Sequence, residues 1–141
     1  QNNLRFSLEG ADLSALTDKK WLHFILRQLI GNAIKYTPQG GQITITLSKN
    51  ERGIWLILTD TGIGIPSEDL QRIFDKGFTG KNGRNEQNKS TGLGLYLAKS
   101  LTQKLGHELY VESFESKGSS FSILFPHLNY YAEPEEDFMI K

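Results

Sequence analysis

Hydrophobic residues recur every three or four positions between Trp21 and Ile34. This spacing places the apolar side chains on one face of a helix, so a long amphipathic helix is predicted there. Asp18 stands where the helix would need an N-cap. A second long helix is predicted from Gly92 to about Leu105, because Gly106 follows as the glycine that commonly ends a helix.

Five short stretches of the chain are predicted to be strands. Residues 4–8 and 43–47 alternate between apolar and polar side chains, and residues 54–58 form a continuous apolar run. Two more strands are expected near residues 108–114 and 119–125. Turn residues separate the second stretch from the third and the fourth from the fifth, so two β-hairpins are predicted.

A short helix is expected to begin at Ser67 and to run to about Phe74. The larger elements then follow in the order strand, helix, hairpin, loop, helix, hairpin. Helices in such an order are expected to cover one face of a mixed sheet. The fold class is therefore α/β, a two-layer sandwich.

Length and composition narrow the class of protein. The 141 residues suit a single domain, and 16 basic side chains balance 16 acidic ones. Without a basic excess, nucleic acid is not an expected partner. The chain has no cysteine, so it has no disulfide and no thiol nucleophile. Because it begins at Gln1 rather than Met, we expect a piece of a longer protein.

Charge is unevenly distributed along the chain. The glycine-rich stretch 75–91 is long for a loop in a compact domain, and such loops are usually functional or disordered. Residues 76–89 within it carry four basic side chains and one acidic side chain, whereas residues 132–141 carry four acidic side chains and one lysine. We therefore expect one domain at residues 1–127 and an acidic tail at residues 128–141.

Asn32, Lys35 and Tyr36 form the first group of candidate functional residues. They lie three and four positions apart near the end of the first predicted helix, so they share one side of it. An amide oxygen is a hard ligand that suits Mg²⁺, a lysine suits phosphate oxygens, and a tyrosine ring can cover a base. The alternative is an ordinary polar helix end, with a lysine favoured by the helix dipole.

Asp60, Gly62 and Gly64 form the second group, directly after a predicted strand. A carboxylate at a strand end can accept a hydrogen bond from the exocyclic amine of adenine. Glycines let a backbone approach a ligand closely. A tight turn that needs a positive φ would explain the same glycines without a ligand.

The third group is the long loop followed by Gly92 and Gly94. A glycine-rich helix start presents free N–H groups and the positive end of the helix dipole to phosphate. The pattern is not a Walker A loop, because no Gly-Lys-Ser/Thr follows a strand. It is not the dinucleotide motif either, because no strand leads directly into it.

The three groups, in this order and at these intervals, resemble the ATP-binding domain of bacterial sensor histidine kinases, of the superfamily shared with gyrase, Hsp90 and MutL. The matching positions run from about Asp18 to Phe125. The stretch Lys76–Arg84 resembles in particular the small Gram-positive kinases that are paired with peptide-antibiotic export systems. The resemblance implies a Bergerat-type ATP-binding fold with ATP and Mg²⁺ as cofactors.

The resemblance also implies a role for each candidate residue. Asn32 would hold Mg²⁺, with Gln28 one turn earlier as a further candidate ligand, and Lys35 would meet the phosphates. Asn32 and Lys35 are thus the catalytic candidates. Asp60 would bind the adenine amine, with Tyr36 beside the base. The remaining candidate ATP-binding residues are Gly62, Gly64, Ile65, Phe74, Phe78, Thr79, Gly80, Lys81, Arg84, Thr91, Gly92, Leu93, Gly94 and Leu95.

Residues 75–91 would form a lid over the triphosphate, with Lys81 or Arg84 directed at the γ-phosphate. The backbone of residues 92–95 would cradle the phosphates. The two phenylalanines among the candidates resemble the aromatic box that packs the start of the lid. Gly118 resembles the last glycine box of the family.

Three features depart from the family pattern. Gln28 stands where many members carry a second asparagine, and residues 78–80 replace an arginine-rich start of the lid. The third departure is that His23, His107 and His127 do not match a phosphoacceptor site. They are expected to be ordinary core-edge or surface residues.

The resemblance therefore implies the catalytic domain of a two-component sensor histidine kinase, which donates the γ-phosphoryl group of Mg·ATP to a histidine on a separate domain. The implied partners are its own phosphoacceptor domain in a homodimeric parent, a response regulator and an export transporter. The implied location is the cytoplasmic side of a bacterial plasma-membrane sensor. An anti-sigma-type serine kinase and a non-catalytic nucleotide sensor are the alternatives. No glutamate stands at positions 28 or 32 to activate water, which disfavours simple ATP hydrolysis.

Overall fold

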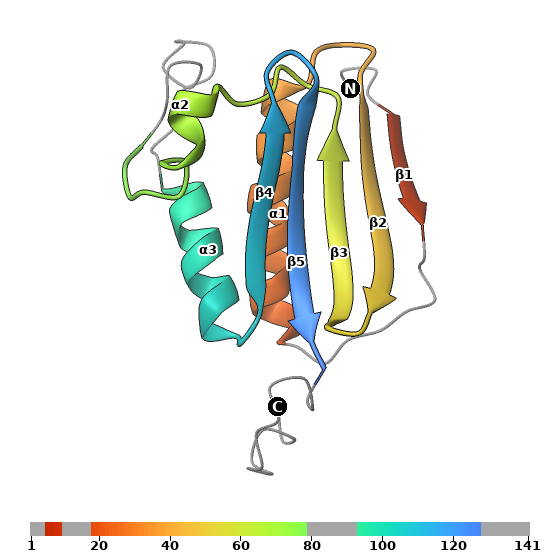
Figure 1. Cartoon of the computed structure of the whole chain (residues 1–141), viewed down its shortest axis with the longest axis vertical. Coiled ribbons are helices and arrows are strands. Elements are labelled where there is room, and N and C mark those ends of the chain that lie inside the picture. The colour runs from red at the N-terminus through yellow and green to blue at the C-terminus, as the bar shows by residue number, and fades with distance from the viewer. Residues whose placement is uncertain (1–4, 10–17, 79–92, 128–141) are drawn as a thin grey trace.

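The computed structural model describes residues 5–9, 18–78 and 93–127. These residues contain the expected succession of elements (Figure 1). In chain order the elements are β1 (Arg5–Glu9), α1 (Lys19–Tyr36), β2 (Gln42–Asn50), β3 (Gly53–Asp60), α2 (Ser67–Leu70), α3 (Gly94–Lys104), β4 (Glu108–Phe114) and β5 (Gly118–Pro126). The described helices include none that is both long and apolar enough to span a lipid bilayer.

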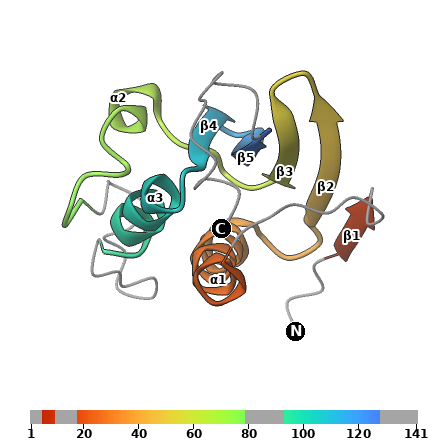
Figure 2. The same ribbon diagram turned by 90° about the horizontal axis from the view of Figure 1, so that it is seen from below.

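The strands form one sheet in the order β1-β2-β3-β5-β4. β1 pairs with β2 in parallel, and the other three pairs are antiparallel. The helices α1 and α3 lie side by side on the same face of this sheet (Figure 2). The predicted two-layer α/β sandwich with a mixed sheet is confirmed.

Helix α1 follows from its sequence. The Oδ1 atom of Asp18 accepts hydrogen bonds from the backbone N–H groups of Lys20 and Trp21, at 3.0 and 3.2 Å, and so caps the first turn. The residues that α1 buries lie four positions apart, at Ile25, Leu29 and Ala33. This spacing turns one continuous stripe toward the sheet.

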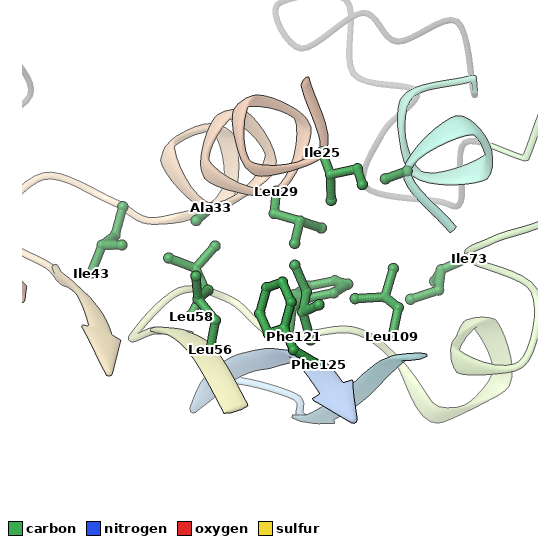
Figure 3. Close-up of a cluster of buried hydrophobic side chains, with 12 residues drawn as sticks. Ile25, Leu29, Ala33, Ile43, Leu56, Leu58, Ile73, Leu109, Phe121 and Phe125 are labelled. Atoms are coloured by element: carbon green, nitrogen blue, oxygen red, sulfur yellow. The ribbon is translucent and has the colours of Figure 1, made fainter. Parts of the chain in front are cut away.

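The core lies between this stripe and the inward-facing residues of the sheet. Ile25 and Leu29 point from α1 toward the sheet, where Phe121 of β5 lies below them (Figure 3). On β3, Leu56 and Leu58 face the core because alternate residues of a strand share one face. The same alternation carries the next inward position to Asp60, so the row of core residues ends in a carboxylate.

Helix α2 is shorter than predicted, because it ends at Leu70 rather than near Phe74. Beyond it the backbone forms four-residue turns, such as the one in which the N–H of Arg72 bonds to the carbonyl of Asp69 at 2.8 Å. Ile73 is buried in the core, and the Phe74 ring meets the Phe121 ring edge-on with centroids 6.3 Å apart. The packing of these two side chains against the sheet replaces the last turn of the predicted helix.

Candidate nucleotide-binding site

Asp60 is the buried carboxylate at the end of β3, with 5% of its surface exposed. Its Oδ1 atom accepts hydrogen bonds from the backbone N–H groups of Gly62 at 2.8 Å and Ser119 at 3.2 Å. Burial raises the pKa of the Asp60 carboxyl, and these two hydrogen bonds partly oppose the shift. The two bonds also fix the orientation of the carboxylate.

The other carboxylate oxygen of Asp60, Oδ2, has a different environment. It accepts no hydrogen bond from any residue that the structure describes, and it is not among the fully buried unpaired atoms of that part of the chain. One oxygen is therefore held by the protein, and the other can accept a hydrogen bond from outside. This is the arrangement needed to bind an amine such as the N6 group of adenine.

Gly62 is a glycine because α1 and Asp60 come close to it. A β-carbon at Gly62 would lie 2.3 Å from the carbonyl oxygen of Tyr36 and 2.9 Å from Oδ1 of Asp60. The adjacent Ile63 N–H donates to the same Tyr36 carbonyl at 3.1 Å. Gly62 thus lies between the last turn of α1 and the Asp60 carboxylate, where there is no room for a side chain.

Gly64 has a positive φ of 76°, and a β-carbon there would lie 2.3 Å from the carbonyl oxygen of Phe114. The N–H of Ser116, in the turn between β4 and β5, donates to the carbonyl of Ile63 at 2.7 Å. The loop of residues 60–65 therefore rests on the tip of the β4–β5 hairpin. Gly64 thus has the positive φ that the tight-turn explanation predicts.

Ser113 and Ser119 support this loop, and the sequence analysis missed both. The Oγ atom of Ser113 accepts from the N–H of Ile65 at 2.8 Å, donates to the carbonyl of Gly118 at 3.0 Å and lies 2.9 Å from Oγ of Ser119. A hydroxyl has a single hydrogen, so Ser119 donates in the last pair. The available signal was a polar side chain on the inward face of β4, after the apolar Leu109 and Val111.

The candidates of α1 lie in its last turns. The Nζ atom of Lys35 lies 5.4 Å from the centroid of the Tyr36 ring. Burial lowers the pKa of Lys35 and raises the pKa of Tyr36. Asn32 is partly buried one turn earlier, on the same side of the helix. The carbonyl of Tyr36 connects this turn to the Asp60 loop, so the first two candidate groups are neighbours in space.

Gly94, from the third group of candidates, is the first residue of α3. Leu93 is the N-cap residue and provides no side-chain cap, and the first hydrogen bond of the helix runs from the N–H of Leu97 to the carbonyl of Leu93. The N–H groups of residues 94–96 have no acceptor within the described residues. The side chain of Gln28 reaches this point, because its Oε1 atom would lie 2.6 Å from a β-carbon at Gly94. Leu95 is partly buried against the core.

The two candidate phenylalanines have separate contacts. Phe74 packs on the core, and the Nζ atom of Lys99 lies 4.8 Å from the centroid of its ring. The ring of Phe78 lies 4.6 Å from the guanidinium carbon of Arg72. The remaining candidates fall outside the described residues, as do most of the predicted lid and the acidic tail. These candidates are Thr79, Gly80, Lys81, Arg84, Thr91 and Gly92.

The three histidines are where the sequence analysis expected them. His23 is exposed on α1, and His127 is exposed after β5. His107 is buried next to Phe125, with the ring centroids 4.6 Å apart, and burial lowers the pKa of its imidazole.

Comparison with known proteins identifies the family. The model of the histidine kinase-, DNA gyrase B- and HSP90-like ATPase family matches residues 17–129. The chain belongs to this ATPase family. The resemblance given by the three motif groups is thereby confirmed, and with it the ATPase fold of the domain.

The sensor protein BceS of Halalkalibacterium halodurans is 41% identical over 129 residues, which cover 92% of this chain and 38% of that protein. The sensor histidine kinase GraS of Staphylococcus haemolyticus is 41% identical over 118 residues, which cover 84% of this chain and 34% of that protein. Both come from Gram-positive bacteria, as the resemblance implied. The chain thus spans little more than a third of the length of these relatives.

Solved structures agree with this assignment. The catalytic domain of histidine kinase ThkA superimposes with a TM-score of 0.74 at 28% identity, covering 89% of this chain and 81% of that one. Full-length ShkA in complex with AMPPNP has a TM-score of 0.74 at 26% identity, covering 89% of this chain and 26% of that one. The domain therefore has the fold of a histidine kinase catalytic domain.

Proposed function

We propose that the chain is the catalytic domain of a two-component sensor histidine kinase, and that it binds Mg·ATP and donates the γ-phosphoryl group to a histidine on a separate domain. The observation that carries the proposal is the Asp60 carboxylate. One of its oxygens is held by two backbone N–H groups, and the other is left to accept a hydrogen bond. The relatives named as sensor histidine kinases supply the reaction class.

At the base end, Oδ2 of Asp60 accepts from the exocyclic amine of adenine. The Gly62–Gly64 loop is held on both sides, by the carbonyl of Tyr36 and by the β4–β5 hairpin, so the carboxylate does not need to be reoriented when the nucleotide arrives. Such preorganisation lowers the cost of binding. Guanine presents a carbonyl oxygen in place of the amine, so Asp60 would select ATP over GTP.

At the phosphate end, the uncapped N–H groups at the start of α3 and the ammonium group of Lys35 are the donors that suit phosphate oxygens. The described residues contain no cluster of three or more His, Asp or Glu side chains that could hold a metal. The amide oxygen of Asn32 would be a protein ligand for Mg²⁺, a hard cation that takes oxygen ligands and shares its coordination with substrate phosphates. When bound, Mg²⁺ neutralises charge on the triphosphate.

The reaction breaks the bond between the γ-phosphorus and the bridging oxygen of ATP and forms a phosphorus–nitrogen bond to the acceptor histidine. The domain's part is to position the nucleotide and stabilise its charge, as in phosphoryl transfer generally. His107 is buried against Phe125, which makes it unsuitable as an acceptor. The acceptor, a homodimeric parent, a response regulator, an export transporter and a location on the cytoplasmic side of a membrane sensor all belong to this proposal.

Titration calorimetry tests the binding step. We expect the wild-type chain to bind Mg·ATP more tightly than Mg·GTP, and Asp60→Asn to weaken ATP binding by about 1–3 kcal/mol. Glu112→Gln, an exposed acid of β4, is the matched control and should bind normally. Failure of the wild-type chain to bind ATP, or an unchanged affinity in Asp60→Asn, would contradict the proposal.

Transfer from radiolabelled ATP to the phosphoacceptor domain of the longer parent tests the reaction. Phosphohistidine is lost in acid and survives base, whereas phosphoserine survives acid. An acid-stable product would favour the serine-kinase alternative, and binding without any transfer would favour a nucleotide sensor.

A further inference from the structure

Helices α1 and α3 lie side by side on the sheet (Figure 2). Gln28 of α1 and Gly94 of α3 meet across this helix pair. A β-carbon at Gly94 would lie 2.6 Å from Oε1 and 3.7 Å from Cδ of Gln28. Real β-carbons do not approach another atom as closely as 2.6 Å, so the flexible end of the Gln28 side chain would have to move away if position 94 carried a β-carbon. The carboxamide of Gln28 thus occupies the space that a side chain at position 94 would need.

The backbone does not explain the glycine at position 94. Gly94 is the first residue of α3, and its φ is not in the left-handed region. Gly31 in α1 provides a comparison, because outside α1 itself no atom of the described residues lies within 4 Å of the position of its missing β-carbon. What sets Gly94 apart is the Gln28 side chain across the helix pair.

Gln28 also shares a face of α1 with Asn32, because the two are four residues apart. It therefore joins the Asn32 face of α1 to the first turn of α3. This turn has no side-chain cap of its own. The length of glutamine matters for the contact, since asparagine at this position would be one methylene shorter.

We propose that Gln28 is a positioning residue, seated on Gly94, that sets the first turn of α3 relative to Asn32. The proposal rests on the proposed function, because these are the two elements assigned to the phosphates and to Mg²⁺. It gives Gln28 a role other than that of a second Mg²⁺ ligand. It also makes Gln28 and Gly94 a single unit, so that loss of either has the same consequence.

The test is a double-mutant cycle with Gln28→Ala, Gly94→Ala and the combined variant, in which nucleotide affinity is measured by calorimetry with Mg²⁺ and with excess EDTA. Each single substitution should weaken binding about 3–10-fold, and the combined variant should be no weaker than the poorer single variant. The loss should persist in excess EDTA, because the first turn of α3 is assigned to the phosphates themselves. Gln28→Asn should behave like Gln28→Ala, and Gly31→Ala is the control that should bind normally.

Additive losses, or normal affinity in Gln28→Asn, would overturn the proposal. A loss seen only with Mg²⁺ would overturn it as well and would make Gln28 a metal ligand. Thermal unfolding without nucleotide tests the contact separately from the proposed function. Gly94→Ala should raise the melting temperature by about 1–3 °C more in the Gln28→Ala background than in the wild-type chain. An equal shift in the two backgrounds would refute the contact, whether or not the chain binds ATP.

Discussion

Gly118 of β5 lies against the backbone of Asp60, so closely that a β-carbon at Gly118 would be 2.0 Å from the Asp60 carbonyl oxygen. The φ of Gly118 is also positive, at 124°. The next residue, Ser119, donates its N–H to the Asp60 carboxylate. The start of β5 and the end of β3 are thus fitted together around the residue that we assign to adenine.

Gly118→Ala should therefore be strongly destabilising. The added β-carbon must push the two strands apart, and the residue must keep a backbone conformation that alanine rarely adopts. Together these effects should lower the free energy of unfolding by about 2–5 kcal/mol, as measured by urea denaturation. Mg·ATP affinity should also fall, because the Ser119 N–H moves away from Asp60.

Gly106→Ala is the control for Gly118→Ala. Gly106 also has a positive φ, at 83°, but apart from its chain neighbours no atom in the described part of the chain lies within 4 Å of its missing β-carbon. It should lose only about 1 kcal/mol, the conformational part of the cost, and bind nucleotide normally. Equal losses in the two variants would show that close packing against Asp60 is not what requires a glycine at position 118.

Local sequence patterns predicted much of the fold. The spacing of apolar residues predicted α1, and the acidic side chain of Asp18 predicted its start. The end of α2 could not be predicted in this way, because Ile73 and Phe74 leave the helix to pack on the core, where Phe74 meets Phe121 of β5, 47 residues later in the chain. Local propensity does not contain that contact.

The candidate site likewise contains residues that local sequence patterns reveal and residues whose role depends on the folded structure. Asp60 and its glycines could be found because they are close together in the sequence. Ser113 could not, because its function depends on a loop 48 residues earlier that reaches it only when the sheet has formed. The seat of Gln28 on Gly94 likewise depends on how α1 packs against α3.

The raised pKa of Asp60 predicts a pH dependence of stability. A carboxyl whose pKa is higher in the folded protein than in the unfolded chain contributes most to stability at low pH. This contribution is lost as the pH rises through the folded pKa. Asparagine does not titrate. The stability of Asp60→Asn relative to wild type should therefore be higher at pH 7 than at pH 4. Urea denaturation at the two pH values measures the difference.

Nucleotide binding should change with pH in the opposite direction. The adenine amine needs an acceptor, so wild-type affinity should fall on acidification as Asp60 becomes protonated. This fall should begin at a higher pH than for an ordinary aspartate, whose pKa is about 3.9. Asp60→Asn, titrated with the same ligand, corrects for protonation of the phosphates. The same pH profile in both proteins would rule out Asp60 as the titrating group.

Ser113→Ala should loosen the loop that carries Asp60. The substitution leaves the N–H of Ile65 without its acceptor and removes the bonds to Gly118 and Ser119. The expected loss in the free energy of unfolding is about 1–3 kcal/mol, together with weaker Mg·ATP binding. Ser122→Ala on β5 is the matched control, because Ser122 has no hydrogen bond from its side chain within the described residues. Equal effects of the two substitutions would show that the Ser113 contacts do not hold the loop.

Gly31→Ala should stabilise the domain without changing the site. Gly31 is exposed in the middle of α1, and its missing β-carbon would meet no atom of another described element within 4 Å. Alanine loses less backbone entropy than glycine when a helix forms, so the free energy of unfolding should rise by about 0.5–1 kcal/mol. Mg·ATP affinity should stay the same, because Gly31 is one residue away from Asn32 and therefore points to a different side of the helix. Calorimetric unfolding and nucleotide titration of one preparation measure both quantities, and a weakened affinity would mean that the nucleotide site extends around α1 to its exposed side.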